Sequence, residues 1–247
     1  FGLGQQQKFP QPQVEAALMR IYRRSNDQSI LQLVNASLGA MARGGLHDWL
    51  AGGFHRYCVD QEWKVPHFEK MLYDNSGLLL NYLEGYQLTQ NDSYKDVAVQ
   101  ILNWVNAEMI HDAGGFYSAV DAGRFEEEGD YYVWTYSELE NELSESELKV
   151  LSTYFDISEG GNFEDGKIVL NLRNSNQLSV LQDPEFSRIR EKLIKARQKR
   201  EYPHLDDKIL VAWNGRMVAA FCKAYQLLGK VDYLEHCQKT MSFIKEN

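Results

Sequence analysis

The chain has 247 residues, of which 44% are hydrophobic and 25% are charged, a composition typical of globular proteins that excludes disordered, collagenous and coiled-coil classes. No apolar run approaches the ~20 residues that a membrane-spanning helix needs, so we do not expect this chain to be an integral membrane protein. The 26 basic and 35 acidic residues give a formal net charge of -9, which argues against nucleic acid as a partner because the chain would repel a polyanion.

Apolar residues at helical spacing predict amphipathic helices along most of the chain. A stripe over residues 14–22 predicts a first helix, and a second stripe over residues 30–41 predicts another. A helical hairpin follows, with one helix over about residues 68–88 and its partner over about residues 92–110.

The second half of the chain contains both strand and helix signals. Two aromatic-rich segments, residues 114–118 and 131–134, lie on either side of an acidic turn and predict the strands of a small β-ribbon insertion. Thr135 and Ser144 each begin a capping box, which predicts two helix starts. The remaining expected elements are a short strand over residues 168–170, a charged surface helix over 185–200, and final helices over about 208–228 and from 231 onward. Because helix dominates, we predict an all-α fold.

The sequence contains an internal repeat. When the segment beginning at Asn75 is laid over the segment beginning at Asn214 without a gap, Tyr86 falls on Tyr225 and the apolar stripes coincide. Amphipathic helices can match by chance, yet the agreement favours duplication. Repeated helical hairpins bury their apolar faces only by stacking, so we expect an open solenoid or a closed ring.

The segments before the two repeated hairpins are also alike. Pro66-His67-Phe68-Glu69-Lys70 resembles Pro203-His204-Leu205-Asp206-Asp207-Lys208 once a small slip in register is allowed. Each copy therefore places a histidine, an acid and a lysine at the entrance of a helical hairpin.

Several motifs together resemble a known family. Gly52-Gly53-Phe54-His55-Arg56-Tyr57, the thirteen-residue run from Trp63 to Asn75, and Gly114-Gly115-Phe116-Tyr117-Ser118-Ala119 carry the resemblance. They resemble the uncharacterised thioredoxin-domain-containing family that includes spermatogenesis-associated protein 20. Further matches, at residues 128–134, 160–164 and 206–215, extend it over almost the whole chain.

The resemblance implies a particular architecture. It implies a thioredoxin-like N-terminal domain, absent from this chain, followed by an α/α toroid similar to the N-acylglucosamine 2-epimerase and six-hairpin glycosidase folds. Residues 1–247 would then be the first part of the toroid, a fragment of a longer chain. The run from Val120 to Arg124 departs from the family pattern, because two acids and a serine are missing there.

The candidate catalytic residues are His67 and Glu69 in the first copy, and His204 and Asp207 in the second. Histidine titrates near neutral pH and therefore suits general acid or base catalysis. Two imidazoles turned into a shared hollow would remove and return a proton on opposite faces of a sugar carbon, as in a sugar epimerase or isomerase. The alternative is that each acid forms an ion pair with the lysine that follows it and only fixes the hairpin entrance.

The candidate substrate-binding residues are polar or aromatic side chains near glycines and helix starts. A glycine-preceded arginine could orient a hydroxyl or carboxylate, and tryptophan could stack on a sugar face. The alternatives are a packed hairpin tip and tryptophans buried in the core. The full set is His55, Arg56, Trp63, Tyr73, Asp74, Asn75, Asp121, Glu128, Trp134, Asp206, Trp213 and Asn214.

Two other functions stay open. Glycoside hydrolysis needs a protonated and an ionised carboxyl group, for which Asp74, Asp121, Glu128, Asp206 and Asp207 are candidates. A non-catalytic module that binds a glycan or a protein is the third possibility. Motifs of serine hydrolases, nucleotide-binding proteins and zinc proteases are absent. We expect a sugar-like small molecule as partner, with no cofactor or metal.

The cysteines and chain ends lead to further expectations. Cys58, Cys222 and Cys237 form neither a disulfide framework nor a zinc-binding pattern, so we expect them to pack as small hydrophobic residues. A reducing, cytoplasmic location is the corresponding expectation, since no signal segment is present. The chain starts at Phe1 and stops within a helical pattern, which indicates a fragment, and the oligomeric state stays open.

Overall fold

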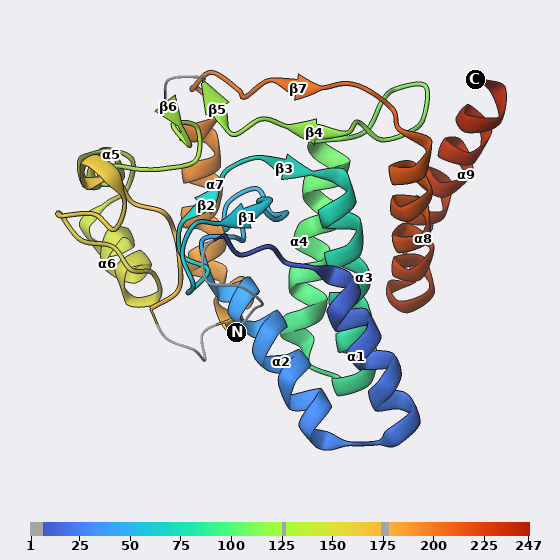
Figure 1. Ribbon diagram of the computed structural model, residues 1–247. Coiled ribbons are helices and arrows are strands. Elements are labelled where there is room, and N and C mark those ends of the chain that lie inside the picture. Colours follow the sequence, from blue (N-terminus) through green and yellow to red (C-terminus); the bar gives the residue numbers. More distant parts are fainter. Residues whose placement is uncertain (1–6, 125–126, 174–177) are drawn as a thin grey trace.

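The computed structural model describes residues 7–124, 127–173 and 178–247. Helices dominate, and the strands are two residues long (Figure 1). The helices are α1 (Pro12–Ser25), α2 (Gln28–Arg43), α3 (Leu72–Thr89), α4 (Asp92–Glu108), α5 (Tyr136–Glu142), α6 (Glu145–Tyr154), α7 (Pro184–Arg197), α8 (Val211–Leu228) and α9 (Val231–Glu246). The strands are β1 (Tyr57–Cys58), β2 (Pro66–His67), β3 (Lys70–Met71), β4 (Ala119–Val120), β5 (Gly123–Arg124), β6 (Glu127–Glu128) and β7 (Leu205–Asp206).

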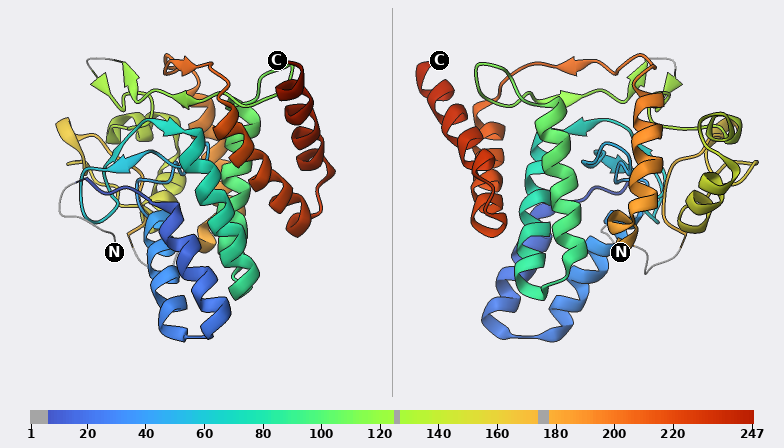
Figure 2. Two further views of the ribbon diagram at one scale, coloured as in Figure 1. Left: turned by 45° about the vertical axis from the view of Figure 1, so that its right-hand side comes forward. Right: turned by 180° about the vertical axis from the view of Figure 1, so that it is seen from behind.

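Three helical hairpins, α1–α2, α3–α4 and α8–α9, build an arc of an α/α toroid. Helix α3 packs against α1 on one side and against α8 on the other, so these three helices form an inner row. Helices α2, α4 and α9 pack against them as the outer row (Figure 2). The predicted all-α toroid with small strands is confirmed. No helix in the described ranges is long and apolar enough to cross a membrane.

The predicted repeat extends to the helix boundaries. The register that lays Asn75 on Asn214 also lays the first and last residues of α3 on those of α8. Both helices end in a left-handed residue, Gln90 with φ 57° and Gly229 with φ 73°. Because ends and caps coincide as well as apolar stripes, the two hairpins are copies of one structural unit.

A buried asparagine in the first turn of α3, and another in the first turn of α8, holds the loop of the preceding unit. Asn75 Oδ1 accepts from the Phe54 backbone N–H at 2.7 Å, and its Nδ2 donates to the Phe54 carbonyl at 2.9 Å. Asn214 makes the same two bonds to Phe116, at 2.7 and 2.9 Å. Each phenylalanine follows two glycines with positive φ, which side chains with a Cβ rarely adopt.

A fully enclosed ion triad fixes β3 to α7. Asp48 Oδ2 lies 2.7 Å from Lys70 Nζ, and Arg197 binds both Asp48 oxygens at 2.9 and 3.0 Å. All three side chains are buried. The alternative in which Glu69 forms an ion pair with Lys70 is therefore wrong, since Glu69 instead binds Arg56 at 2.8 Å.

The predicted β-ribbon is wrong in its strands. Residues 131 and 132 form a turn, and Tyr131, Tyr132 and Val133 pack with Phe68 in a small second core cluster. The two-stranded hairpin is β5–β6, within the acidic turn itself. The expected strand over 168–170 is reduced to an isolated bridge between Ile168 and Trp134. Aromatic residues are frequent both in strands and in buried turns, because both environments bury large side chains. Their enrichment alone therefore did not identify a strand here.

Candidate functional site

A three-stranded sheet brings the two predicted entrances together above α3 and α8. Strand β4 pairs with β3 on one edge and with β7 on the other. Segments far apart in the sequence thus lie side by side (Figure 1). Beyond β4, the Asp121 backbone N–H donates to the His204 carbonyl at 2.9 Å. β4 therefore separates the strand that follows His67 from the strand that follows His204.

Six side chains form what we call the entrance cluster: Arg56, His67, Glu69, Tyr73, Asp74 and Glu128. His67 Nδ1 lies 2.6 Å from Glu128 Oε1, and its Nε2 lies 3.7 Å from Glu69 Oε2. The imidazole stacks on Tyr57, with ring centroids 4.8 Å apart. The His67 side chain is 25% exposed, so a small molecule can reach it.

Opposite charges shift the ionisation of this histidine and its acid. Hydrogen bonding to Glu69 and the charge of Glu128 raise the pKa of His67 above its ordinary value, although partial burial opposes the shift. The hydrogen bond with His67 lowers the pKa of Glu69, and the hydrogen bond from Arg56 lowers it further. The cluster therefore favours an ionised Glu69 beside an imidazole that binds a proton more strongly than a free one.

Asp74 is ionised less readily than Glu69. Its side chain lies in the first turn of α3 and is buried, and its Oδ2 has no hydrogen-bond partner among the described residues. Burial raises the pKa of Asp74 to about 7, with Arg56 acting in the opposite direction and Glu69 adding to the rise. The two carboxyl groups thus have pKa values moved in opposite directions, a pattern common in acid–base pairs.

The second entrance is arranged differently from the first. His204 and Asp207 are exposed, and Lys208 binds Asp206 at 3.1 Å rather than the adjacent Asp207. Within the described residues, His67 is held by Glu69 and Glu128, whereas His204 is exposed on the other side of β4, so the two predicted bases have different surroundings.

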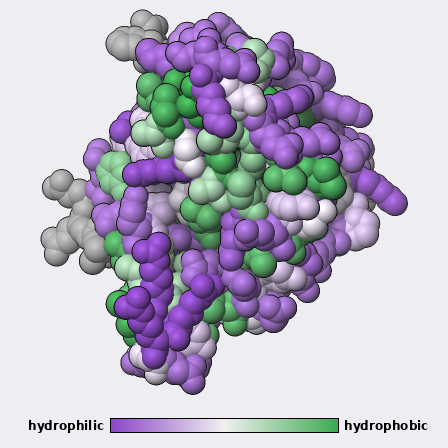
Figure 3. Space-filling view, turned by 90° about the vertical axis from the view of Figure 1, so that its right-hand side faces the viewer, coloured by the Kyte–Doolittle hydropathy of each residue, from purple (hydrophilic) through white to green (hydrophobic). Residues whose placement is uncertain are grey.

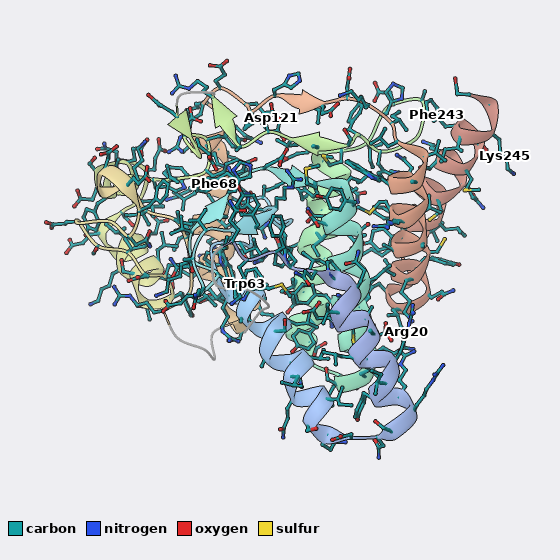
Figure 4. The ribbon with its side chains drawn as sticks, viewed as in Figure 1. Arg20, Trp63, Phe68, Asp121, Phe243 and Lys245 are labelled. Atoms are coloured by element: carbon teal, nitrogen blue, oxygen red, sulfur yellow. The ribbon has the colours of Figure 1, made fainter. Side chains whose placement is uncertain are left out.

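Several predicted binding residues belong to the scaffold. Asn75 and Asn214 are buried and hold backbone loops, as described above. His55 is buried, its Nδ1 lies 2.7 Å from the Phe68 carbonyl oxygen, and burial lowers its pKa to about 3. Trp63 and Trp134 are also enclosed, so neither indole face is available to stack on a sugar; Figure 4 shows Trp63 and Phe68 inside the fold.

Two predicted residues stay near accessible surface. Trp213 is half-buried, and its ring meets Tyr73 of the entrance cluster with centroids 4.8 Å apart. Asp121 is half-buried and lies at the upper edge of the molecule in Figure 4. Both therefore stay candidates for contact with a ligand, whereas the sequence did not predict the contact between Trp213 and Tyr73.

A groove on the inner helices was not predicted. Its volume is about 300 Å³, and every lining residue comes from α1, α3 or α8. Arg20 lies on the side of α1 that faces away from α2 (Figure 4). Tyr73 belongs both to this groove and to the entrance cluster. The groove lining is Pro12, Gln13, Ala16, Arg20, Tyr73, Ser76, Gly77, Leu80, Asn81, Glu84 and Arg216.

A second cavity of about 390 Å³ lies under the β5–β6 hairpin. It is lined by charged residues of both signs and by Trp134, over whose ring Arg200 sits at 4.2 Å. Within the described residues, no cluster of three or more His, Cys, Asp or Glu side chains could hold a metal ion.

The chain is similar to known proteins in sequence and in fold. No protein-family model matches it. It is 36% identical to human spermatogenesis-associated protein 20 over its entire length and covers 36% of that protein. The chain thus spans little more than a third of this curated relative.

Solved structures share the fold. A family 76 glycoside hydrolase (mannosidase) from Bacteroides thetaiotaomicron matches with a TM-score of 0.55 and 12% identity, over 94% of this chain and 43% of that one. An inactive variant of an α-1,6-mannanase from Salegentibacter, in complex with α-1,6-mannotriose, matches with a TM-score of 0.53 and 15% identity, over 96% and 46%. At such identities the likeness establishes the toroid architecture alone.

Proposed function

We propose that this homologue of spermatogenesis-associated protein 20 is a carbohydrate-active enzyme in which His67 moves a proton on a sugar carbon adjacent to a carbonyl. The observation that carries the proposal is the setting of His67, a partly exposed imidazole between two carboxylates. Because His204 lies apart, the reaction uses one base. A single imidazole suffices for aldose–ketose isomerisation, in which the proton leaves and returns on the same face.

The geometry supports a division of roles between the two ring nitrogens. The short contact of Nδ1 with Glu128 favours a proton on Nδ1 in the neutral ring, which leaves the Nε2 lone pair as the base. When Nε2 takes a proton from the sugar carbon, the resulting imidazolium lies 3.7 Å from the Glu69 carboxylate. Arg56 fixes that carboxylate. Return of the proton to the neighbouring carbon, together with the shift of the hydroxyl proton from O2 to O1 of the sugar, completes the isomerisation.

The inner-helix groove supplies a place for the rest of the sugar. Its volume of about 300 Å³ is at the lower end of small-molecule sites. Tyr73 belongs to both the groove and the entrance cluster, and the Trp213 ring packs against it. Polar side chains such as Gln13 and Glu84 line the groove beside apolar ones, a mixture that suits a sugar ring.

Proton exchange in D₂O tests the proposal directly. Aldoses and ketoses are incubated with the protein, and deuterium at C2 is followed by NMR. We expect His67→Gln to slow exchange by about 100-fold or more. His204→Gln, a matched histidine change at an exposed position, should leave the rate unchanged. Equal loss in both variants would restore the two-base reaction, and exchange that survives His67→Gln would refute the role of His67.

A hydrolase is the second candidate, because Glu69 and Asp74 have oppositely shifted pKa values and the fold resembles family 76 hydrolases. In this reaction protonated Asp74 would protonate the leaving oxygen and ionised Glu69 would act on the sugar carbon or a water. Release of reducing sugar from α-1,6-linked manno-oligosaccharides measures it. Asp74→Asn and Glu69→Gln should each abolish release. Sugar binding without exchange or hydrolysis would identify a binding module instead.

A further inference from the structure

Two of the three cysteines meet across the last helical hairpin. Cys222 lies on α8 and Cys237 on α9, and their Sγ atoms are 3.3 Å apart. Cys237 Sγ also donates to the Val218 carbonyl at 3.4 Å. The third cysteine, Cys58, is fully buried near the start of the chain. The pair is thus preformed, while the remaining thiol is enclosed elsewhere in the core.

We propose that Cys222 and Cys237 form an oxidation site at which a peroxide converts the two thiols into a disulfide that joins α8 to α9. In the first step the Cys222 sulfur attacks one peroxide oxygen, the O–O bond breaks, and a sulfenic acid and water form. In the second step Cys237 Sγ attacks the sulfenic sulfur. The hydroxyl leaves as water with the Cys237 proton, so hydrogen peroxide is reduced to two waters in total.

Exposure assigns the order of the two steps. Cys222 is partly exposed, whereas Cys237 is 3% exposed, so a dissolved peroxide meets Cys222 first. Burial raises the pKa of Cys237 to about 12, which keeps that thiol protonated and slow to react with peroxide itself. Once the Cys222 sulfenic acid has formed, however, Cys237 is already at contact distance.

The product would join α8 and α9 covalently. The bond closes a loop across the turn at Gly229, and the sulfurs need to approach by only about 1.3 Å to reach bonding distance. Helices α8 and α9 lie at one side of the molecule (Figure 1). Figure 3 faces that side and shows hydrophobic patches among hydrophilic ones, and Val211 and Val231 of these helices are exposed. Because Trp213 and Asn214 are on α8, the disulfide restrains the helix that carries them.

Thiol counting and mass spectrometry test the proposal on the whole chain. After treatment with hydrogen peroxide and removal of the excess, we expect the three free thiols to fall to one and the intact mass to fall by two hydrogen atoms. Peptide mapping should find Cys222 joined to Cys237 and Cys58 still reduced. Heating should then show a higher unfolding temperature for the oxidised chain, which dithiothreitol returns to the starting value.

Single cysteine variants distinguish the Cys222–Cys237 disulfide from oxidation at other thiols. In Cys237→Ser the sulfenic acid on Cys222 has no resolving partner, so dimedone should label it. In Cys222→Ser neither labelling nor thiol loss should occur at the same peroxide dose. Cys58→Ala should oxidise as the unaltered chain does. Retention of all three thiols, a bond to Cys58, or a disulfide only between two chains would overturn the proposal.

Discussion

Asn214 repeats on α8 the two backbone hydrogen bonds that Asn75 makes on α3. Each amide satisfies the N–H and the C=O of a phenylalanine in a loop that belongs to the preceding unit. Because both backbone groups are buried there, the asparagine replaces the pairing that a strand would otherwise supply. The same side chain therefore performs the same structural role in two copies of the hairpin.

Replacing either asparagine should cost similar stability. Asn75→Ala and Asn214→Ala each leave a buried N–H and a buried C=O without their partner, at about 1–3 kcal/mol for each group. Urea unfolding followed by circular dichroism measures the loss. Asn103→Ala, on the exposed face of α4, is the matched control and should change the unfolding free energy little. A large loss in only one of the two buried variants would contradict the equivalence of the copies.

Asp74 should make the protein less stable as the pH rises. Its pKa is raised from 3.8 to about 7 in the folded chain, so the folded state holds a proton that the unfolded state has released. Stability therefore falls between about pH 4 and about pH 7, by about 1.4 kcal/mol for each pKa unit. Asp74→Asn removes this dependence.

Unfolding free energies at several pH values, taken as the difference between the unaltered chain and Asp74→Asn, isolate this contribution. The variant should gain stability relative to the unaltered chain as the pH rises, and the gain should level off above the folded pKa. A difference that is independent of pH would show that Asp74 ionises normally.

Within the buried triad, replacing Asp48 should lower the free energy of unfolding more than replacing Lys70. Asp48→Asn leaves Lys70 and Arg197 as two enclosed cations without their shared anion, and breaking a buried pair in this way costs about 3–5 kcal/mol. Lys70→Met keeps the bidentate pair between Arg197 and Asp48. Guanidinium unfolding of the two variants should thus rank them in that order, and the reverse ranking would refute the shared-anion description.

Gly53 should tolerate no side chain. A Cβ there would lie 2.7 Å from the Trp104 ring, and the residue has φ 75°. We expect Gly53→Ala to lower the unfolding free energy by more than about 1 kcal/mol. Gly160, which has nothing within 4 Å of an added Cβ, provides the control, and Gly160→Ala should be neutral or slightly stabilising. Thermal unfolding of both variants is sufficient to compare them.

The sequence predicted the hairpins better than it predicted the ion pairs. Apolar spacing located the helices of both repeats, although α3 begins at Leu72 rather than near residue 68 because Lys70 and Met71 join the sheet. Side chains alternate between the faces of an extended segment. Neighbours such as Glu69 and Lys70 therefore point apart, whereas Asp206 and Lys208, two residues apart, form an ion pair.

In the candidate site, too, the sequence predicted residues within one motif but not contacts between distant segments. The sequence marked His67, Glu69, Tyr73 and Asp74 because they lie close together in one motif. It could not reveal that Glu128 reaches His67 from the β5–β6 hairpin, or that the groove lies on inner-helix faces. Such contacts depend on how separate segments cross in space, and a single sequence carries little local signal for them.

The path between β4 and β7 has an evolutionary and engineering consequence. The chain leaves the sheet after β4, builds α5, α6 and α7, and returns as the adjacent strand β7, so topology alone would permit deletion of the whole excursion. Arg197 at the end of α7 forbids it, because removal would strip Asp48 of one of its two counter-charges. The segment that connectivity alone would allow to be removed is therefore tied to the rest of the protein by a buried guanidinium, as well as by contacts such as Arg190 with the Leu50 carbonyl and Glu128 with His67.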